Sequence, residues 1–207
     1  MAHTRIRFAL FVTAVAATTC VNTIAAQRIP AEAWANADLR VRRLSPNTFE
    51  QLPALIRKEL IRLGCTIPQI YDEERPHNVI SGRLMSSGGT DWAVLCSRDR
   101  ISAILVFRQG RTPPIELAAA PDANFLQGLG GTMIGFSRVI SVATPRFIRR
   151  ASTAARSAAQ PAPASDERVG PLPTPLDHDG IDDAFAGKGS AVHYFHSGRW
   201  LTLAGSD

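Results

Sequence analysis

The spacing of apolar and polar residues predicts an amphipathic helix in the first half of the chain. Its apolar positions recur at helical spacing and fall on one side. These positions are Phe49, Leu52, Ile56, Leu60 and Leu63. Thr48 can cap such a helix, but Pro53 is tolerated only in a first turn and shifts the expected start towards itself. Gly64 supplies the end.

The next segment has the composition of β-strands. Three runs of β-branched, aromatic and aliphatic residues are separated by short polar loops, which predicts a three-stranded antiparallel meander. The runs are 78–85, 90–96 and 101–108. Residues 93–95 and 104–107 are continuously apolar, so both faces of these strands should be covered, one of them by the helix.

Residues 191–203 predict a β-hairpin that turns at Ser197 and Gly198 and pairs Phe195 with Trp200. Because a lone hairpin is not stable, we expect it to dock on the meander and complete one sheet. The predicted fold class is α+β: an antiparallel sheet, made of the three-stranded meander and the C-terminal hairpin, covered by the N-terminal amphipathic helix.

Other segments give weaker signals. Residues 27–44 show no clear period and predict an ordered arm or a loose lead-in, and 115–118 suggest a short strand. Asp122 can cap a turn of helix, Pro145 suits the start of a second helix, and 181–185 predict a further helical turn.

A proline-rich stretch interrupts the second half of the chain. Residues 158–175 contain five prolines and almost no large apolar side chain, so they cannot bury enough surface to order themselves. We therefore predict a flexible Pro/Ala-rich linker inside a single domain formed by residues 27–157 and 176–207.

Residues 1–26 have the pattern of a secretory signal peptide, because two arginines precede an acid-free apolar stretch. Its strongly apolar part, 8–17, is about half the ~20 residues that a membrane anchor needs. Cleavage is expected after Ala25 or Ala26. The alternatives are an uncleaved anchor and lipid attachment at Cys20. The mature protein is expected in the periplasm or outside the cell, meeting the membrane only through the signal peptide before cleavage.

Export changes the interpretation of the cysteines. Cleavage leaves Cys65 and Cys96 in a compartment where disulfides persist. A bridge between them would stabilise the fold by roughly 3 to 4 kcal/mol on the chain-entropy model. The alternative is that each is a buried small apolar residue.

Charge excludes a nucleic-acid partner. The net charge is +5, and removal of Arg5 and Arg7 with the signal peptide leaves about +3. Arginines cluster at 40–43 and 146–156, but no aromatic residues that could stack on bases are interleaved with them. A solvated face is expected, with weak adhesion to anionic surfaces as the alternative.

One acidic stretch has the composition of a hard-cation site. Four carboxylates surround a glycine, as in loops that supply oxygen ligands to Ca²⁺. They are Asp177, Asp179, Asp182 and Asp183. Lys188 stands where the full calcium-loop pattern needs glutamate, so the alternative is a helix-capping acidic turn. His193 and His196 lie on opposite faces of the predicted hairpin and cannot share a metal ion.

No catalytic residue can be assigned. Ser137 has a glycine two positions before it, Gly135, but none two positions after it, so it does not lie in a nucleophile elbow. The glycine-rich stretch 128–135 lacks the ending of a phosphate loop and predicts turns or bulges. Trp92 and Trp200 are candidate contact aromatics, with core packing as the alternative for each.

Two segments suggest a relationship. The first segment contains Ser81, Gly82 and Arg83, then residues 89–95, then the predicted strand that ends with 104–107. The second segment runs from 179 to 207. This pattern resembles exported bacterial proteins with FG-GAP or VCBS-like strand patterns. The resemblance implies a β-sheet module with no established activity. The chain departs from true FG-GAP repeats in lacking a clear internal repeat and a complete calcium loop.

The sequence therefore favours a non-catalytic binding or structural module of the cell envelope over an enzyme. Its partner would be an unknown protein or envelope component, and no cofactor is expected. The alternative is a hydrolase, or a calcium-dependent module, that uses the acidic loop 177–183 with a nearby histidine.

Overall fold

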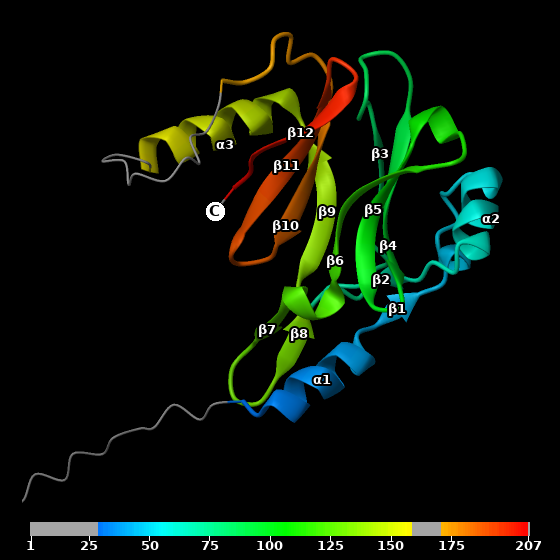
Figure 1. The fold of residues 1–207 in the computed structure, drawn as a ribbon, viewed down its shortest axis with the longest axis vertical. Helices are drawn as coiled ribbons and strands as arrows, with labels where there is room; N and C mark the ends of the chain where they lie inside the picture. The colour runs from blue at the N-terminus through cyan, green and yellow to red at the C-terminus, as the bar shows by residue number, and fades with distance from the viewer. Residues whose placement is uncertain (1–28, 159–170, 207) are drawn as a thin grey trace, which may run out of the picture.

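The structure, a computed structural model, describes residues 29–158 and 171–206. The predicted signal peptide and most of the predicted linker lie outside these residues. The described chain is a mixed α+β fold in four layers, with one helix on the outer face of each of two antiparallel sheets (Figure 1). The α-helices are α1 (Ala31–Arg40), α2 (Ala54–Arg62) and α3 (Pro145–Ala158). Within the described part, no helix is both long and apolar enough to cross a membrane.

The first sheet contains the predicted meander. Its strands follow in the order β3-β4-β5-β6, all antiparallel. They are β3 (Val79–Gly82), β4 (Asp91–Arg98), β5 (Ile101–Phe107) and β6 (Ile115–Pro121). Asp99 and Arg100 connect β4 to β5 with positive φ angles of 50° and 63°, as a two-residue hairpin turn requires. The meander is confirmed, and β6 extends it by one strand.

Helix α2 covers the outer face of this sheet. Its buried side chains pack against the outward-facing residues of β4 and β5, so that both apolar surfaces are removed from water. The helix begins at Ala54, after Pro53. The alternative start at Thr48 is wrong, because Pro46–Thr48 form a separate 3₁₀ turn, η1, capped by the side chain of Ser45.

The C-terminal hairpin belongs to a second sheet with the order β12-β11-β10-β9. Its strands are β9 (Arg138–Ala143), β10 (Gly180–Phe185), β11 (Gly189–His196) and β12 (Arg199–Ala204). The hairpin turn and the pairing of Phe195 with Trp200 are confirmed. The expectation that the hairpin completes the meander is wrong, because β10 occupies its pairing edge. Residues 181–185 are thus a strand and not a helical turn.

The two sheets pack face to face around the main core. Leu95 and Ile104 from the first sheet and Ile140 and Ile181 from the second belong to one buried cluster. Helix α3 covers the outer face of the second sheet, where Ile148 packs with neighbouring strand residues. Pro145 begins this helix as predicted, after Thr144.

Shorter elements close one end of the molecule. Residues 31–40 form α1, so the segment predicted as an arm or lead-in is largely helical. The two-stranded sheets are β1 (Arg43–Leu44) with β2 (Ile67–Pro68), and β7 (Leu126–Gly128) with β8 (Ile134–Phe136). The 3₁₀ turns η2 (Arg108–Gly110) and η3 (Asp122–Phe125) follow β5 and β6. Figure 1 shows α1 beside β7 and β8 at this end, far from α3.

Candidate functional site

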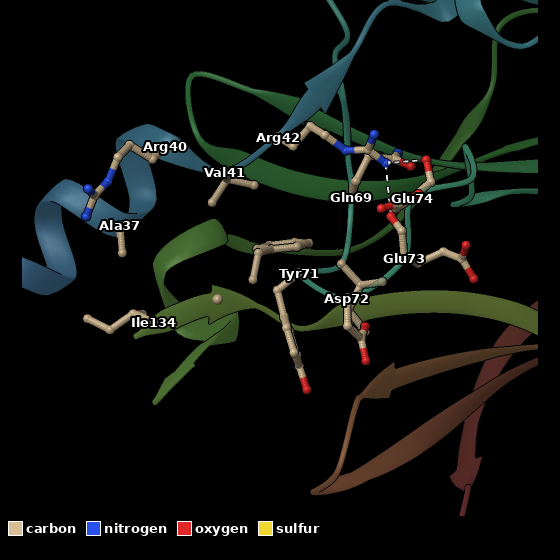
Figure 2. A pocket seen from close by; sticks show the side chains of 13 residues that line it. Ala37, Arg40, Val41, Arg42, Gln69, Tyr71, Asp72, Glu73, Glu74 and Ile134 are labelled. Carbon is tan, nitrogen blue, oxygen red and sulfur yellow. Dashed lines mark hydrogen bonds between the residues drawn. The ribbon is translucent and has the colours of Figure 1, made fainter. Parts of the chain in front are cut away.

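A cleft of about 510 Å³ lies between α1, the loop after β2 and strand β8. A second concavity, of about 930 Å³, shares Arg40, Tyr71 and Ile134 with it and continues along the turn between β7 and β8. We call the two together the Tyr71 cleft. Apolar side chains and charged side chains both line its first part, as Figure 2 shows. The apolar ones are Ala37, Val41, Ile70, Ile134 and Phe136, and the charged ones are Arg40, Arg42, Asp72, Glu73 and Glu74.

Partly buried side-chain hydrogen bonds hold the loop that forms one wall of the cleft. The amide of Gln69 donates to the carbonyl of His77 at 3.1 Å and accepts from the His77 N–H at 2.9 Å. The Ile70 N–H donates to Nε2 of His77 at 2.8 Å. Residues 69 and 77 therefore close the loop on itself, and a turn-rich segment takes a defined shape.

Three further hydrogen bonds fix the loop against its neighbours. Arg42 donates to the carbonyl oxygens of Glu73 and Glu74, each at 3.0 Å. The Tyr71 N–H donates to the carbonyl of Phe136 in β8 at 3.0 Å. A Cβ on Gly135 would lie 2.5 Å from the Cβ of Tyr71, so this glycine allows the close approach.

The cleft combines acidic side chains, two of them outside any ion pair of the described chain, with two arginines and exposed apolar surface. Glu73 pairs with Arg75, whose backbone and side-chain hydrogen bonds lower the pKa of that carboxyl. Asp72 and Glu74 make no ion pair within the described residues. Tyr71 is 47% exposed, and Figure 2 shows its side chain between those of Asp72 and Ile134. Such a surface suits a ligand that carries both a cation and apolar groups.

The loop should loosen in acid because His77 accepts a hydrogen bond from Ile70. Burial lowers the pKa of His77 below its ordinary value, so the neutral ring is the form that the folded loop prefers. The stabilisation is present above the unfolded-state pKa of about 6.5 and is lost as pH falls through the lower folded pKa. We expect hydrogen-exchange protection of the Ile70 amide to fall in that range. In His77→Gln, whose amide oxygen accepts at every pH, protection should stay constant; an equal fall in both proteins would contradict the assignment.

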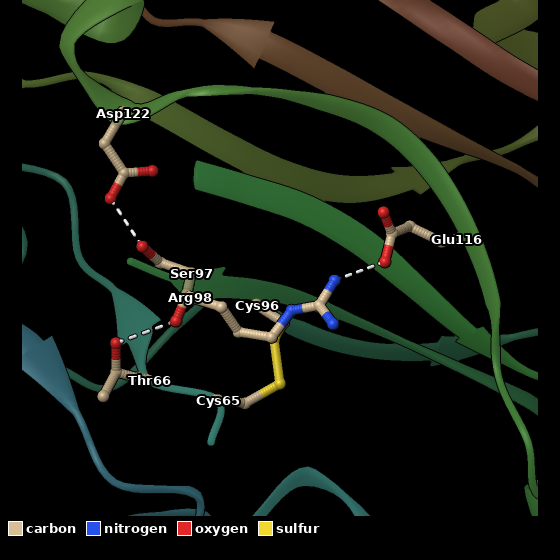
Figure 3. Close-up of a disulfide and its surroundings, with 7 residues drawn as sticks. All are labelled: Cys65, Thr66, Cys96, Ser97, Arg98, Glu116 and Asp122. Atoms are coloured by element: carbon tan, nitrogen blue, oxygen red, sulfur yellow. Dashed lines mark hydrogen bonds and ion pairs between the residues drawn. A yellow bond between two sulfur atoms is a disulfide. The ribbon is translucent and has the colours of Figure 1, made fainter. Parts of the chain in front are cut away.

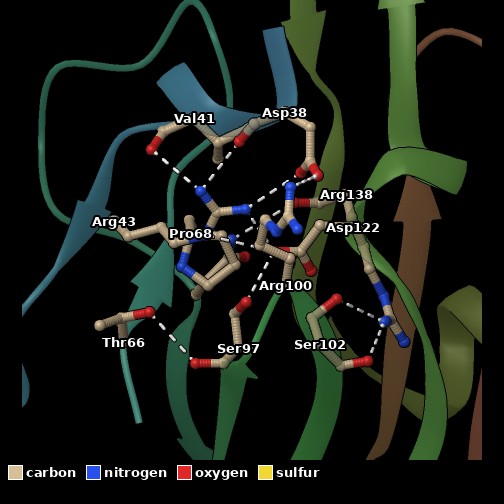
Figure 4. A network of polar contacts seen from close by, with 11 residues as sticks. Asp38, Val41, Arg43, Thr66, Pro68, Ser97, Arg100, Ser102, Asp122 and Arg138 are labelled. Atoms are coloured by element: carbon tan, nitrogen blue, oxygen red, sulfur yellow. Dashed lines mark hydrogen bonds and ion pairs between the residues drawn. The ribbon is translucent and has the colours of Figure 1, made fainter. Parts of the chain in front are cut away.

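A polar network fixes α1, the other wall of the cleft (Figure 4). Arg43 donates to Asp122 at 2.7 Å and to Asp38 of α1 at 3.2 Å. Asp122 is fully buried and also accepts from the hydroxyl of Ser97 in β4 at 2.6 Å. Arg100, in the turn after β4, donates to Asp38 at 3.3 Å. The network ties α1 to the first sheet, so the cleft has a rigid frame.

The structure does not bring the predicted calcium ligands together. Asp177 is exposed, and Asp179 accepts a hydrogen bond from the backbone of Arg83 at 3.2 Å. Asp182 and Asp183 are neighbours in β10, so their side chains point to opposite faces of the sheet. Within the described part of the chain, no group of three or more histidine, cysteine or acidic residues is arranged to hold a metal ion.

The inward-facing carboxylate, Asp183, serves as the partner of a buried arginine. Burial alone would raise the pKa of Asp183, but hydrogen bonds from Arg138 and His193 lower it below its ordinary value. The bonds from Arg138 measure 2.9 and 2.8 Å. Burial raises the pKa of Asp182, and hydrogen bonding to Ser190 opposes this only in part.

The two histidines nearest the acidic stretch contact its backbone and the side chain of Asp183. His193 lies 3.5 Å from Asp183, on the inner face of β11, and that carboxylate is already bound by Arg138. The two ring nitrogens of His178 lie 2.8 and 2.9 Å from the carbonyl oxygens of Asp179 and Phe195. Both rings therefore make structural contacts, and neither lines the Tyr71 cleft.

Cys65 and Cys96 form a disulfide that joins the end of α2 to β4 (Figure 3). Beside it, Thr66 and Ser97 exchange two backbone hydrogen bonds of 3.0 and 2.8 Å. The predicted pairing is present, and it links the covering helix to the sheet that the helix covers.

The two candidate contact aromatics are packed against the cores. Trp92 contacts the cluster beneath α2, and Trp200 contacts the cluster between the sheets. The rings of Trp200 and Phe195 lie edge to face, 5.5 Å apart. These contacts favour the packing alternative for both tryptophans.

Sequence reasoning missed the Tyr71 cleft. One signal was present: Tyr71 is followed directly by Asp72, Glu73 and Glu74 in a segment between predicted elements, and polar loops next to a scaffold often carry binding residues. Comparisons with family models, curated proteins and solved structures gave no match to this chain. Function must therefore be argued from the site itself.

Proposed function

We propose that the protein is an exported, non-catalytic binding module of the cell envelope, with the Tyr71 cleft as its ligand site. One observation carries the proposal: an exposed aromatic ring, two carboxylates without ion-pair partners in the described chain and an apolar floor meet in one concave surface. Its first part, about 510 Å³, has the size of ordinary ligand sites.

The cleft best suits an extended segment of a partner polypeptide that contains a basic residue beside an apolar one. A lysine or arginine side chain can lie over the ring of Tyr71 and face Asp72 and Glu74. A neighbouring apolar side chain would cover Ile134 and Met133, the latter 63% exposed. The opening towards β7 and β8 lets a chain run through both parts of the cleft.

The buried charges support binding rather than catalysis. Arg138 and His193 each contact Asp183 inside the sandwich, and none of the three residues lines the Tyr71 cleft. An active site needs a titratable group that can reach substrate. The Tyr71 cleft holds such groups, three carboxylates and Tyr71 itself, but within the described residues its lining includes no histidine, cysteine or serine from which a nucleophile and its base could be paired, so we favour binding.

Two features support export. Residues 1–26, outside the described part of the chain, have the sequence pattern of a signal peptide. The disulfide between Cys65 and Cys96 fits an oxidising compartment, because cytosolic thiols are kept reduced.

Selection from a displayed library of random peptides tests the binding site. We expect enriched peptides to carry lysine or arginine next to an apolar residue. Their affinity for Tyr71→Ala should fall by about fivefold to thirtyfold, since an aromatic anchor contributes about 1 to 2 kcal/mol. The Cβ that packs on Gly135 is retained in this variant, so the loop should keep its place.

The matched control is Ile61→Ala, which removes a side chain of similar exposure from α2, outside the cleft. It should bind the selected peptides as the unaltered protein does. If the library yields no peptide that distinguishes the unaltered protein from Tyr71→Ala, or if both variants lose affinity equally, the proposed site is wrong.

A further inference from the structure

Helix α3 presents a continuous face of arginines to the solvent. One side of the helix is buried against the second sheet through Ile148, Ala151 and Ser152. The opposite side carries four exposed arginines within one arc of the helical wheel. They are Arg146, Arg149, Arg150 and Arg156, and we call them the α3 arginine face.

This charge is unbalanced within the described chain. Helix α3 contains no acidic residue. No ion pair in the described residues involves any of the four arginines. Arg156 donates to the hydroxyl of Ser152 at 2.7 Å, and Arg150 lies 5.9 Å from the ring of Phe147. The other donors of the face point to solvent.

The arrangement opposes helix stability. Arg146 and Arg149 lie near the helix N-terminus, where the positive end of the helix dipole disfavours cations. Arg149 and Arg150 also lie three and four residues after Arg146, the spacings at which like charges on a helix repel each other. Departures from local preference of this kind concentrate at functional surfaces. Because the four arginines do not stabilise the helix, we look for a binding partner that they contact.

We propose that the α3 arginine face docks the folded protein onto a membrane surface rich in anionic lipids. This inference is independent of the Tyr71 cleft. It also goes beyond the expectation that only the signal peptide meets the membrane. The apolar side of α3 is already buried against the sheet, so contact would be electrostatic and peripheral, without insertion. Each arginine near an anionic surface strengthens binding about fivefold.

A lipid surface fits the face better than other anions. From Arg146 to Arg156 the charges extend along about 15 Å of helix, which is more than one phosphate can span, whereas headgroups form a continuous layer. Nucleic acid is disfavoured because the one aromatic residue of α3, Phe147, packs against the sheet core instead of offering a ring for stacking. In Figure 1 the helix lies on an outer side of the molecule, away from α1, so docking would leave the Tyr71 cleft open.

Vesicle co-sedimentation of the full mature chain tests the proposal. The probes are vesicles of phosphatidylcholine alone and of phosphatidylcholine mixed with phosphatidylglycerol. We expect binding only to the mixed vesicles at about 0.1 M salt, and release at about 1 M salt, where the Debye length falls from ~10 to ~3 Å. The triple variant Arg149→Gln, Arg150→Gln, Arg156→Gln should bind about a hundredfold more weakly.

The matched control removes three exposed positive charges elsewhere: Lys58→Gln, Arg108→Gln and Arg111→Gln. It has the same net charge as the α3 variant and should lose about fivefold or less. Thermal unfolding by circular dichroism checks both variants, and the α3 variant should be at least as stable as the parent because its repulsion is relieved.

Three results would overturn the proposal. Equal losses in the two triple variants would show that net charge alone drives adsorption. Binding that survives high salt would show a contact of another kind. Binding of duplex DNA or free phosphate without binding to the mixed vesicles would assign the face to a different anion.

Discussion

Replacing Arg138 by alanine is expected to lower the free energy of unfolding by about 3 to 5 kcal/mol, the cost of breaking a buried ion pair from one side. Arg138 is fully buried between the sheets. Its guanidinium donates to Asp183 in β10, to the hydroxyl and carbonyl of Ser102 in β5 at 3.0 and 2.9 Å, and to the carbonyl of Ala118 in β6 at 2.8 Å. One side chain therefore joins strands of both sheets.

The bonding pattern explains why lysine should not replace this arginine. The planar guanidinium presents five N–H donors in a fixed fork, and all three nitrogens are engaged here. The ring of Phe125 lies 4.4 Å from the guanidinium carbon. The Ala118 carbonyl turns inward because the pairing of β5 and β6 shifts between Ser102 and Ile104. Arg138→Lys should thus lose most of what Arg138→Ala loses.

Urea unfolding of a double-mutant cycle measures the effect. Arg138→Ala and Asp183→Ala should each destabilise strongly, and the double variant should cost less than the sum of the two, because neither charge is then left buried alone. The matched surface pair is Arg75 with Glu73, for which the losses are expected to be small and additive because solvent screens exposed charges. Additive losses at Arg138 and Asp183 would contradict the role of the pair.

The spacing of apolar residues and turns predicted the elements that are formed by residues close together in the sequence. The meander and the C-terminal hairpin follow from strand runs and short turns, and the Ser197–Gly198 turn has the positive φ angles, 49° and 82°, that its type requires. The sheet order could not be predicted in the same way. Residues 181–185 were predicted as a helical turn, and a strand with a buried carboxylate forms there because Arg138, distant in the sequence, and His193 bind Asp183.

The candidate site was still less accessible to sequence reasoning, because the cleft is assembled from three separated segments. Arg40 in α1 belonged to a basic cluster interpreted as a solvated face, and Tyr71 and Ile134 gave no pattern of their own. Gly135 was interpreted as a turn or bulge glycine. The need for a glycine at this position is evident only from the structure, where Tyr71 packs against it.

Reduction of the Cys65–Cys96 disulfide is expected to lower the free energy of unfolding by about 3 to 4 kcal/mol. The bridge spans a sequence separation of 31 residues, so its removal returns the entropy of a long loop to the unfolded chain. The native contacts beside it do not depend on the bond. The backbone hydrogen bonds between Thr66 and Ser97 and the packing of α2 on β4 can persist after reduction.

Urea unfolding with and without reductant shows whether the disulfide acts on the unfolded chain or on the folded protein. If the disulfide acts on the unfolded chain, the reduced protein should unfold at lower urea with a larger m-value, because its unfolded state exposes more surface. A Cys65→Ser, Cys96→Ser variant should match the reduced protein and ignore reductant. An unchanged midpoint on reduction would mean that the unfolded chain is already compact around this loop, and the bridge would then stabilise the domain far less than loop closure predicts.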